Sequence, residues 1–285
     1  MLTRRAAVAT LLASGAGIRA AGAQAAYPDQ PVRMIVPFAP GGPGDTVARL
    51  IGRVMGDRLG KPVVVENRSG GGGVIGVEAA ARSRPDGHTV VLASTGALAI
   101  LPHLMPRMPY DPLRDLAPVS LVLAVPQVIV VGKSLRVRTL QDLVAEAKKR
   151  PGQITYGSAG NGTTTHLAAE LFRLRAGIEL VHVPYRGAAP AMADLLAGQV
   201  DMLLPDVPVV LPHVRDGAVV ALGVAARERN AALPEVPTIA EGGVPGVESG
   251  TWYGLLAPAS TPPTGSRPCR PRPLRRWAMR QPAAR

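Results

Sequence analysis

The 285-residue sequence contains a single cysteine, Cys269, and only 3% aromatic residues. One thiol cannot form an intramolecular disulfide, so the core must be held together without disulfide bonds. After residue 25, no apolar run is long and uncharged enough to span a membrane. The many alanine, valine, leucine and glycine residues instead suit a closely packed α/β protein, and the length allows two domains of ordinary size.

Acidic residues are missing from both ends of the chain, which explains the formal net charge of +12. Three arginines lie in the first 25 residues and seven lie after residue 264. Residues 26–264 keep 22 basic and 20 acidic residues, a net charge of +2. Because the excess positive charge belongs to the ends, we expect no nucleic-acid binding by the folded part.

Residues 1–25 have the parts of a secretory signal peptide. Arg4-Arg5 precede an apolar run from Ala6 to Ile18, and small residues lead to a cleavage site at Ala23-Gln24-Ala25. The paired arginines leave Sec and Tat export both open. No cysteine follows the signal for lipid attachment, so we expect a chain that is soluble outside the cytoplasm and does not insert into a membrane.

The N-terminal part of the folded chain begins with a strand, a glycine-rich loop and a helix. An apolar strand over Val32–Val36 is followed by the loop Pro37–Gly44 and by a helix that ends near Leu59. Asp45 or Thr46 is expected to cap this helix, because a short polar side chain accepts bonds from the first N–H groups. Free N–H groups and the helix dipole both favour negative charge, so this unit predicts an anion site.

The same unit occurs again later in the chain. A strand over Ile154–Tyr156 leads through the polar, glycine-rich loop Gly157–Thr165 into a helix from His166. Two such units predict two lobes that face each other across one cleft, with a ligand held by backbone N–H groups from both sides.

Strands alternate with helices through the remaining sequence, which predicts mostly parallel sheets with ligand-binding loops at the carboxyl ends of the strands. Segment 119–131 is too long for one usual strand and contains Pro126, so we expect it to leave one sheet and enter a second. Thr139 and Asp142 form a capping-box pattern at the start of another helix. Further strands are expected at 62–67, 89–93, 179–183, 200–204 and 219–225, and further helices at 74–83, 190–197 and 206–215.

Motifs for nucleotide, metal and covalent chemistry are all incomplete. No Lys-Ser/Thr pair follows Gly41–Gly44, and Ser69–Gly73 lacks the dinucleotide spacing. The five histidines are scattered, so we expect no metal site and no cofactor. Ser158 lies in a sequence one residue short of the nucleophile elbow and has no evident base. A secreted hydrolase would therefore require a turnover that is lost when Ser158 is replaced.

The chain resembles the substrate-binding family of tripartite tricarboxylate transporters, also called Bug proteins, over residues 27–264. The resemblance rests on a series of short motifs in the same order rather than on any one of them. These motifs are Tyr27-Pro28, Pro37-Phe38-Ala39-Pro40-Gly41-Gly42 with Asp45, Val65-Glu66-Asn67-Arg68, Pro85-Asp86-Gly87, Gly160-Asn161-Gly162 with His166-Leu167-Ala168, Val183-Pro184-Tyr185-Arg186-Gly187, Gly198-Gln199-Val200-Asp201 and Leu233-Pro234-Glu235-Val236-Pro237-Thr238.

The resemblance implies a two-lobed periplasmic-binding-protein type II fold that closes on a small organic carboxylate and delivers it to integral membrane subunits. We expect lobe 1 at 26–124 plus 227–264, lobe 2 at 125–226, and a periplasmic monomer that is not an enzyme. In this family, backbone amides and waters of two facing loops hold the carboxylate. Carried over to this chain, ligand contacts are expected at Gly41, Gly42, Asp45, Ser94, Ser158, Asn161, Gly162, Thr164, His166 and Tyr185.

The chain departs from the family pattern in two places. After Gly198–Asp201 the family often has an aromatic and acidic pair, whereas this chain reads Met202–Asp206, so ligand choice does not transfer. Residues 265–285 are rich in arginine and proline where the family continues with an amphipathic helix, and we hypothesise that this tail is out of frame. A non-functional truncated family member, or an adaptor that docks a membrane sensor, is the alternative. Tyr185, Trp252 and Tyr253 suit either a ligand cover or the core.

Overall fold

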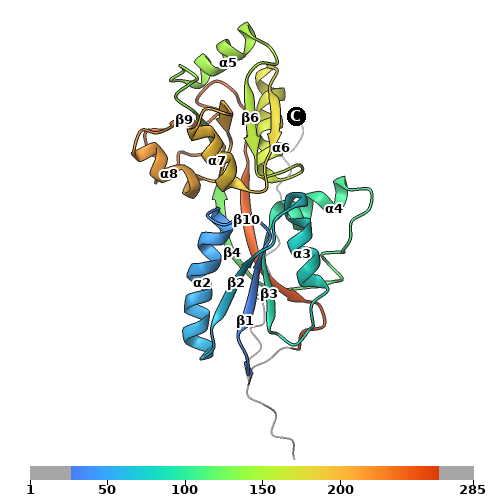
Figure 1. The fold of residues 1–285 in the computed structure, drawn as a ribbon. Coiled ribbons are helices and arrows are strands. Elements are labelled where there is room, and N and C mark those ends of the chain that lie inside the picture. Colours follow the sequence, from blue (N-terminus) through green and yellow to red (C-terminus); the bar gives the residue numbers. More distant parts are fainter. Residues whose placement is uncertain (1–26, 263–285) are drawn as a thin grey trace, which may run out of the picture.

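A computed structural model describes residues 27–262, which form two lobes (Figure 1). The expected signal peptide at 1–25 and the unusual tail at 265–285 lie outside the described residues. Within 27–262, none of the helices has the length and apolar character needed to cross a bilayer.

Lobe 1 is built on a five-stranded sheet with the order β2-β1-β3-β10-β4. β1 pairs in parallel with β2 and β3, as the alternation of strands and helices predicted, whereas β10 runs antiparallel to β3 and β4. The elements of this lobe are β1 (Val32–Val36), α2 (Pro43–Leu59), β2 (Val63–Asn67), α3 (Val74–Ala81), β3 (Thr89–Ser94), α4 (Leu101–Leu104), β4 (Leu116–Pro126) and β10 (Gly250–Pro258), with short helical turns at 71–73 and 96–100.

Both faces of the lobe 1 sheet are covered by helices. Because successive side chains of a strand point to opposite faces, Met34 and Val36 pack in the core under α2 while Ile35 packs under α3. Figure 1 shows α2 on one side of this sheet and α3 with α4 on the other. The apolar residues of β1, which only Arg33 interrupts, are thus explained by burial against helices on both faces of the sheet.

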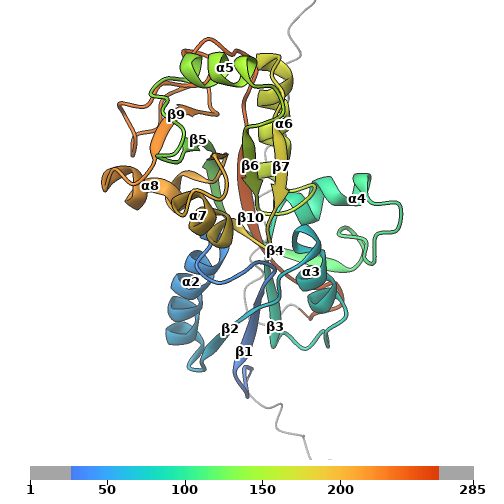
Figure 2. The same cartoon turned by 45° about the horizontal axis from the view of Figure 1, so that its top comes forward.

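Lobe 2 has a second five-stranded sheet with the order β7-β6-β8-β5-β9. One core contains Leu140 of α5 and Phe172 of α6, and the other contains Leu195 of α7 and Val210 of α8. Figure 2 shows the two pairs of helices around this sheet. The elements are β5 (Val128–Val131), α5 (Leu140–Lys149), β6 (Thr155–Ser158), α6 (Thr164–Ala176), β7 (Val181–Pro184), α7 (Ala188–Leu196), β8 (Met202–Leu203), α8 (Val207–Arg215) and β9 (Val220–Val224).

The two lobes are joined where β4 and β10 run side by side. β4 ends at Pro126 and β5 begins at Val128, so the expected passage of segment 119–131 between two sheets is confirmed. The chain returns at Gly250, which pairs with Pro126. The two crossings therefore lie next to each other, as in a hinge.

The second crossing is later in the chain than the sequence suggested. We expected residues from 227 onward to belong to lobe 1, but Leu233 and Val236 pack in one core of lobe 2, and Ile239 and Val244 pack in the other. These apolar side chains are buried only because segment 227–249 wraps around lobe 2. The boundary near 227 is therefore wrong, and the chain enters lobe 1 at the start of β10.

Helix starts agree with the sequence in one case and differ in another. The capping box of α5 is present, because Thr139 Oγ1 accepts a bond from Asp142 N at 3.1 Å and Asp142 Oδ2 accepts one from Thr139 N at 3.0 Å. The expectation that Asp45 or Thr46 caps α2 is wrong, because this helix begins at Pro43 with Gly42 as its N-cap. Proline suits the first helical position, where no N–H partner is needed.

Phe172 tests the lobe 2 core because its side chain is fully buried on α6. We expect Phe172→Ala to lower the free energy of unfolding by about 3–5 kcal/mol, since it removes apolar burial and leaves a cavity. Leu174→Ala on the same helix is the control, because Leu174 is 66% exposed and should change stability by less than about 0.5 kcal/mol. Urea unfolding measures both, and equal losses would contradict the assigned packing.

Candidate functional site

The N-termini of α2 and α6 line one narrow cavity between the lobes, which we call the cleft cavity. Its volume is about 20 Å³, close to the ~10–15 Å³ that a single water requires. It is lined from lobe 1 by Phe38, Gly42, Pro43, Gly44, Ser94, Thr251 and Tyr253, and from lobe 2 by Ala159, Thr163, Thr164, Thr165, Ala188 and Asp206. The two strand–loop–helix units of the sequence therefore meet across one space.

The lobes touch each other around this cavity. Ala39 N donates to Arg186 O at 3.1 Å, and the hydroxyls of Thr164 and Thr251 lie 2.7 Å apart. Gly72 leaves room for the facing loop, since an added Cβ would come within 2.8 Å of Asn161 O. The structure thus shows the lobes closed on each other.

The groups of the cleft cavity that favour an anion are backbone N–H groups. No lysine or arginine is among its lining residues. The first N–H groups of a helix have no partner within the helix, and the helix dipole places partial positive charge there. Two such ends on one cavity favour an anion that can accept several N–H bonds at once.

Asp45 holds the first loop in place. Its Oδ2 accepts bonds from Gly41 N and Arg49 Nε, and its Oδ1 accepts bonds from Arg49 and from Asn67, each at 3.0 Å. Asn67 also donates to Phe38 O at 3.0 Å. Burial favours a raised pKa for Asp45, but the bonds from Arg49, Gly41 and Asn67 outweigh it and lower the pKa. Asp45 therefore remains ionised and holds the loop Pro37–Gly44 through bonds made outside the cleft cavity.

Hydroxyl groups hold the second loop. Thr163 Oγ1 donates to Gly160 O at 2.7 Å, and Thr165 Oγ1 accepts a bond from Ala159 N at 2.9 Å. Ser158, which is 2% exposed, accepts a bond from Gly160 N at 3.1 Å. These bonds fold the loop over the end of α6, so that its first turn faces α2.

The structure supplies Ser158 with a partner that the sequence did not reveal. Ser158 Oγ lies 2.6 Å from Nε2 of His182, which stands on the neighbouring strand β7. Burial, and then the nearby His166, lower the pKa of His182 to about 4, so its ring is neutral at neutral pH. His166 stacks on His182 with ring centroids 4.1 Å apart.

This serine and histidine lack the rest of a hydrolytic site. Gly160 N donates to Ser158 itself and Ala159 N donates to Thr165, so neither of these N–H groups is free to stabilise an oxyanion. Among the described residues, no carboxylate bonds to the ring of His182 to orient it. The geometry therefore suits a structural hydrogen bond under the loop.

A second cavity of about 170 Å³ lies beside the cleft cavity and shares Phe38 and Ala159 with it. It is lined by the glycine run Gly70–Gly73 of lobe 1 and, among others, by Asn161 and Tyr185 of lobe 2. Tyr185 donates to Asp194 Oδ2 at 2.7 Å, and burial together with this carboxylate raises the pKa of Tyr185 to about 12. The hydrogen bond to Asp194 thereby fixes the Tyr185 ring in the wall of the second cavity.

The expected contact residues are distributed over these spaces. Gly42, Ser94 and Thr164 line the cleft cavity, Asn161 and Tyr185 line the second cavity, and Ser158 lines a small space of about 10 Å³ behind the loop. The remaining four line none of these cavities. They are Gly41 and Asp45 in the first loop, and Gly162 and His166, which bond to each other at 3.2 Å through Gly162 N and His166 Nδ1.

Sequence reasoning missed a group of cleft residues at the hinge. Asp206 precedes α8, where an aspartate is typical of a helix cap, but its side chain makes no cap bond. It instead accepts bonds from Thr251 at 2.7 Å and from Tyr253 at 2.9 Å, both on β10. No local sequence pattern predicts these hydrogen bonds, because Asp206 is far from Thr251 and Tyr253 in the chain.

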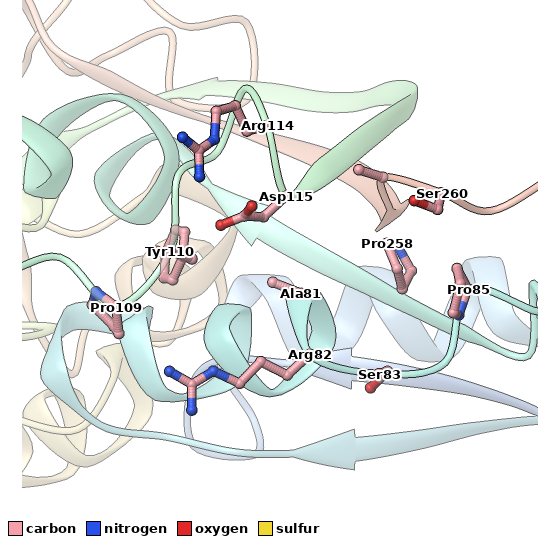
Figure 3. A pocket seen from close by; sticks show the side chains of 11 residues that line it. Ala81, Arg82, Ser83, Pro85, Pro109, Tyr110, Arg114, Asp115, Pro258 and Ser260 are labelled. Atoms are coloured by element: carbon pink, nitrogen blue, oxygen red, sulfur yellow. The ribbon is translucent and has the colours of Figure 1, made fainter.

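A larger cavity of about 400 Å³ lies on lobe 1 at the other end of β10 (Figure 3). Two of its polar side chains already have partners. Arg82 pairs with Glu78 at 2.7 Å, and Tyr110 donates to Ala97 O at 2.7 Å. We therefore consider this cavity a weaker candidate for a ligand site than the cleft.

Comparisons with known proteins agree with this geometry. A family model described as tripartite tricarboxylate transporter family receptor matches residues 47–283. Protein BugT of Bordetella pertussis is 43% identical over 263 residues, which cover 92% of this chain and 81% of BugT.

Two solved structures share the fold. That of R. palustris Rpa4515 with adipate has a TM-score of 0.81 and 37% identity, and the match covers 83% of this chain and 79% of that one. MatC from Rhodopseudomonas palustris with bound malate has a TM-score of 0.79 and 35% identity, with 83% and 80% covered. The two-lobed α/β fold expected from the sequence is confirmed.

Asp45→Asn tests the anchoring of the first loop. Because the folded-state pKa of Asp45 is lowered, its ionised form stabilises the protein fully above the unfolded value of about 3.9, and this contribution is lost as pH falls through the lower folded-state pKa. We expect the variant to lose about 1–3 kcal/mol at pH 7 and a smaller amount at pH 3. Urea unfolding at both pH values measures this, with exposed Asp57→Asn as control. Equal losses of stability at pH 7 and pH 3 would contradict the proposal that ionised Asp45 anchors the first loop.

Proposed function

Because this chain belongs to the tripartite tricarboxylate transporter receptor family, we propose that it captures a small organic carboxylate in the periplasm and delivers it to the membrane subunits of such a transporter. Members of this family are solute-binding proteins, and we propose the same non-enzymatic role here. Capture occurs by closure of the two lobes about the β4 and β10 hinge.

One observation carries the proposal, namely that two helix N-termini from different lobes line the same cavity. Each end favours an anion by about 0.3–1 kcal/mol when exposed and by up to ~2 kcal/mol when partly buried. A carboxylate between them also accepts backbone N–H bonds from both lobes. Such a ligand binds the closed form better than the open one, which is the differential affinity that closure requires.

The relatives support the choice of ligand class. One solved relative holds adipate and another holds malate, and both ligands carry two carboxylates. In this chain the second cavity, with Asn161 and Tyr185, adjoins the cleft cavity. We propose that one carboxylate lies between the helix ends and that the remainder of the molecule extends toward Asn161 and Tyr185.

A panel of organic acids tests the function. We expect at least one di- or tricarboxylate, acidic amino acid or aromatic acid to raise the melting temperature of the purified protein. A ligand at a hundred times its Kd adds about 2.7 kcal/mol to the stability of the folded state. Neutral sugars serve as controls. A panel in which no acid changes the melting temperature would remove the main support.

Gly42→Val tests the place of binding. Gly42 has φ −79, and the only heavy atom within 4 Å of an added Cβ is Ala39 O at 3.7 Å, so the fold accepts a side chain there. The added atoms enter the cleft cavity, and we expect the affinity for the acid found above to fall about tenfold or more, since overpacking costs about 1–3 kcal/mol. Ala232→Val on the exposed surface is the control. Unchanged affinity, measured by calorimetry, would place the ligand elsewhere.

A further inference from the structure

Asp206 is a buried acid in the wall of the cleft cavity, only 3% exposed. Its carboxylate spans the hinge, because it stands on lobe 2 and accepts its bonds from the hydroxyls of Thr251 and Tyr253 on β10. Thr251 in turn lies 2.7 Å from the hydroxyl of Thr164 in the first turn of α6. Asp206 is thus connected to both the hinge and the helix end that faces the ligand.

The bonding partners of Asp206 are neutral. Within residues 27–262, it forms no ion pair with a lysine, arginine or histidine, and its further neighbour is the side chain of Gln127. A buried carboxylate without a cation is costly to ionise. Burial accordingly raises the pKa of Asp206 to about 6, although the bonds from Thr251, Tyr253 and Gln127 oppose the rise.

Other titratable groups on the surrounding elements are occupied elsewhere or are uncharged. Tyr253 on β10 has a pKa raised well above its usual value by burial and by Asp206. Asp45 on α2 is held by Arg49, and His166 on α6 accepts a bond from Gly162 N. Asp194 on α7 accepts the bond from Tyr185. On α8 itself, His213 and Arg215 lie in the last turn, at the opposite end from Asp206.

A ligand carboxylate between the helix ends would share the cleft cavity with Asp206. Two anions in one buried space repel each other, and such a pair relieves the repulsion by binding one proton. The N–H groups of the two helix ends bond directly to the ligand's carboxylate, whereas Asp206 accepts no cap bond from α8, which it precedes, and is held only by neutral hydroxyl and amide side chains. The proton therefore goes to Asp206.

We propose that Asp206 takes up one proton from solvent when the cleft closes on a ligand carboxylate, so that capture is coupled to protonation of this residue. The proposal rests on the carboxylate-binding function proposed above. The neutral carboxyl group then has a hydrogen to donate within the cleft, and the proton returns to solvent when the ligand leaves. Asp206 thereby makes affinity for an anionic ligand depend on pH without contributing a positive charge.

The experiment measures Kd for adipate and for malate between pH 6 and pH 8.5 by titration calorimetry, in two buffers with different ionisation enthalpies. For the wild-type protein, we expect affinity to weaken by about tenfold for each pH unit above about 6.5, as uptake of one proton requires. The difference in heat between the buffers should report about one proton taken up per ligand.

Two variants accompany this measurement. Asp206→Asn keeps the shape of the side chain but cannot bind the proton, so its affinity should be independent of pH. Asp216→Asn changes the same charge at the exposed end of α8 and should behave as the wild type does. If Asp206→Asn fails to fold, proton uptake by the wild-type protein still decides the question.

The outcomes separate this inference from the proposed function. Binding of adipate or malate with no proton uptake, or with the same pH dependence in Asp206→Asn, would overturn the inference and leave carboxylate capture standing. Tight, pH-independent binding of aspartate that Asp206→Asn abolishes would show an ionised Asp206 paired with an ammonium group, and would also overturn it. Failure of the wild-type protein and both variants to bind any acid of the panel at pH 6 would overturn both.

Discussion

The pairing of β4 with β10 determines how the two lobes relate to each other. Both chain crossings lie on these strands, and Gly250 pairs with Pro126 where they leave lobe 1. Beside them, Gln127 is fully buried and accepts a bond from the hydroxyl of Ser249 at 2.7 Å. A connection of two adjacent strands permits rotation of one lobe against the other while limiting sliding. In the proposed capture of a ligand, the cleft opens and closes around the paired strands β4 and β10.

The loops that face the cleft are held by bonds made away from it. Asp45 receives four hydrogen bonds from behind the first loop, and Thr163 and Thr165 fix the second. The N–H groups at the two helix ends are therefore positioned before a ligand arrives, which reduces the ordering cost of binding. Near-neutral charge over residues 26–264 fits a site that would attract an anion through local N–H groups and not through the net charge of the protein.

Much of the fold followed from local patterns in the sequence. The apolar run Val32–Val36 and the alternation of strands with helices predicted the parallel part of the first sheet, and Pro126 marked the passage between sheets. Segment 227–249 has no strand or helix of its own, apart from a single bridge at Thr238, so nothing local showed which lobe it covers. Its apolar residues are explained only by the surface that lobe 2 offers them.

Side-chain roles at the site were harder to predict because they depend on partners from distant parts of the chain. Asp45 reads as a helix cap until the pairing of β1 with β2 brings Asn67 to it. His182 reaches Ser158 through the register of β6 and β7, and Asp206 meets β10 only in the folded hinge. The family resemblance identified the loops, whereas the direction of each side chain required the fold.

The proposed carboxylate site at the two helix ends consists of main-chain N–H groups, which constrains how the protein can diverge. A substitution at Gly42 or Thr164 can obstruct a backbone N–H group, but it cannot remove that group as it would remove an arginine. In the proposed site, part of the affinity for a carboxylate therefore comes from the backbone, and a substitution weakens it by adding bulk beside an N–H group, as expected for Gly42→Val. Replacing the side chains of Asn161 and Tyr185, which line the adjoining cavity, leaves these N–H groups in place. Related proteins can therefore bind different molecules while the N–H groups at the N-termini of α2 and α6 still bind the carboxylate.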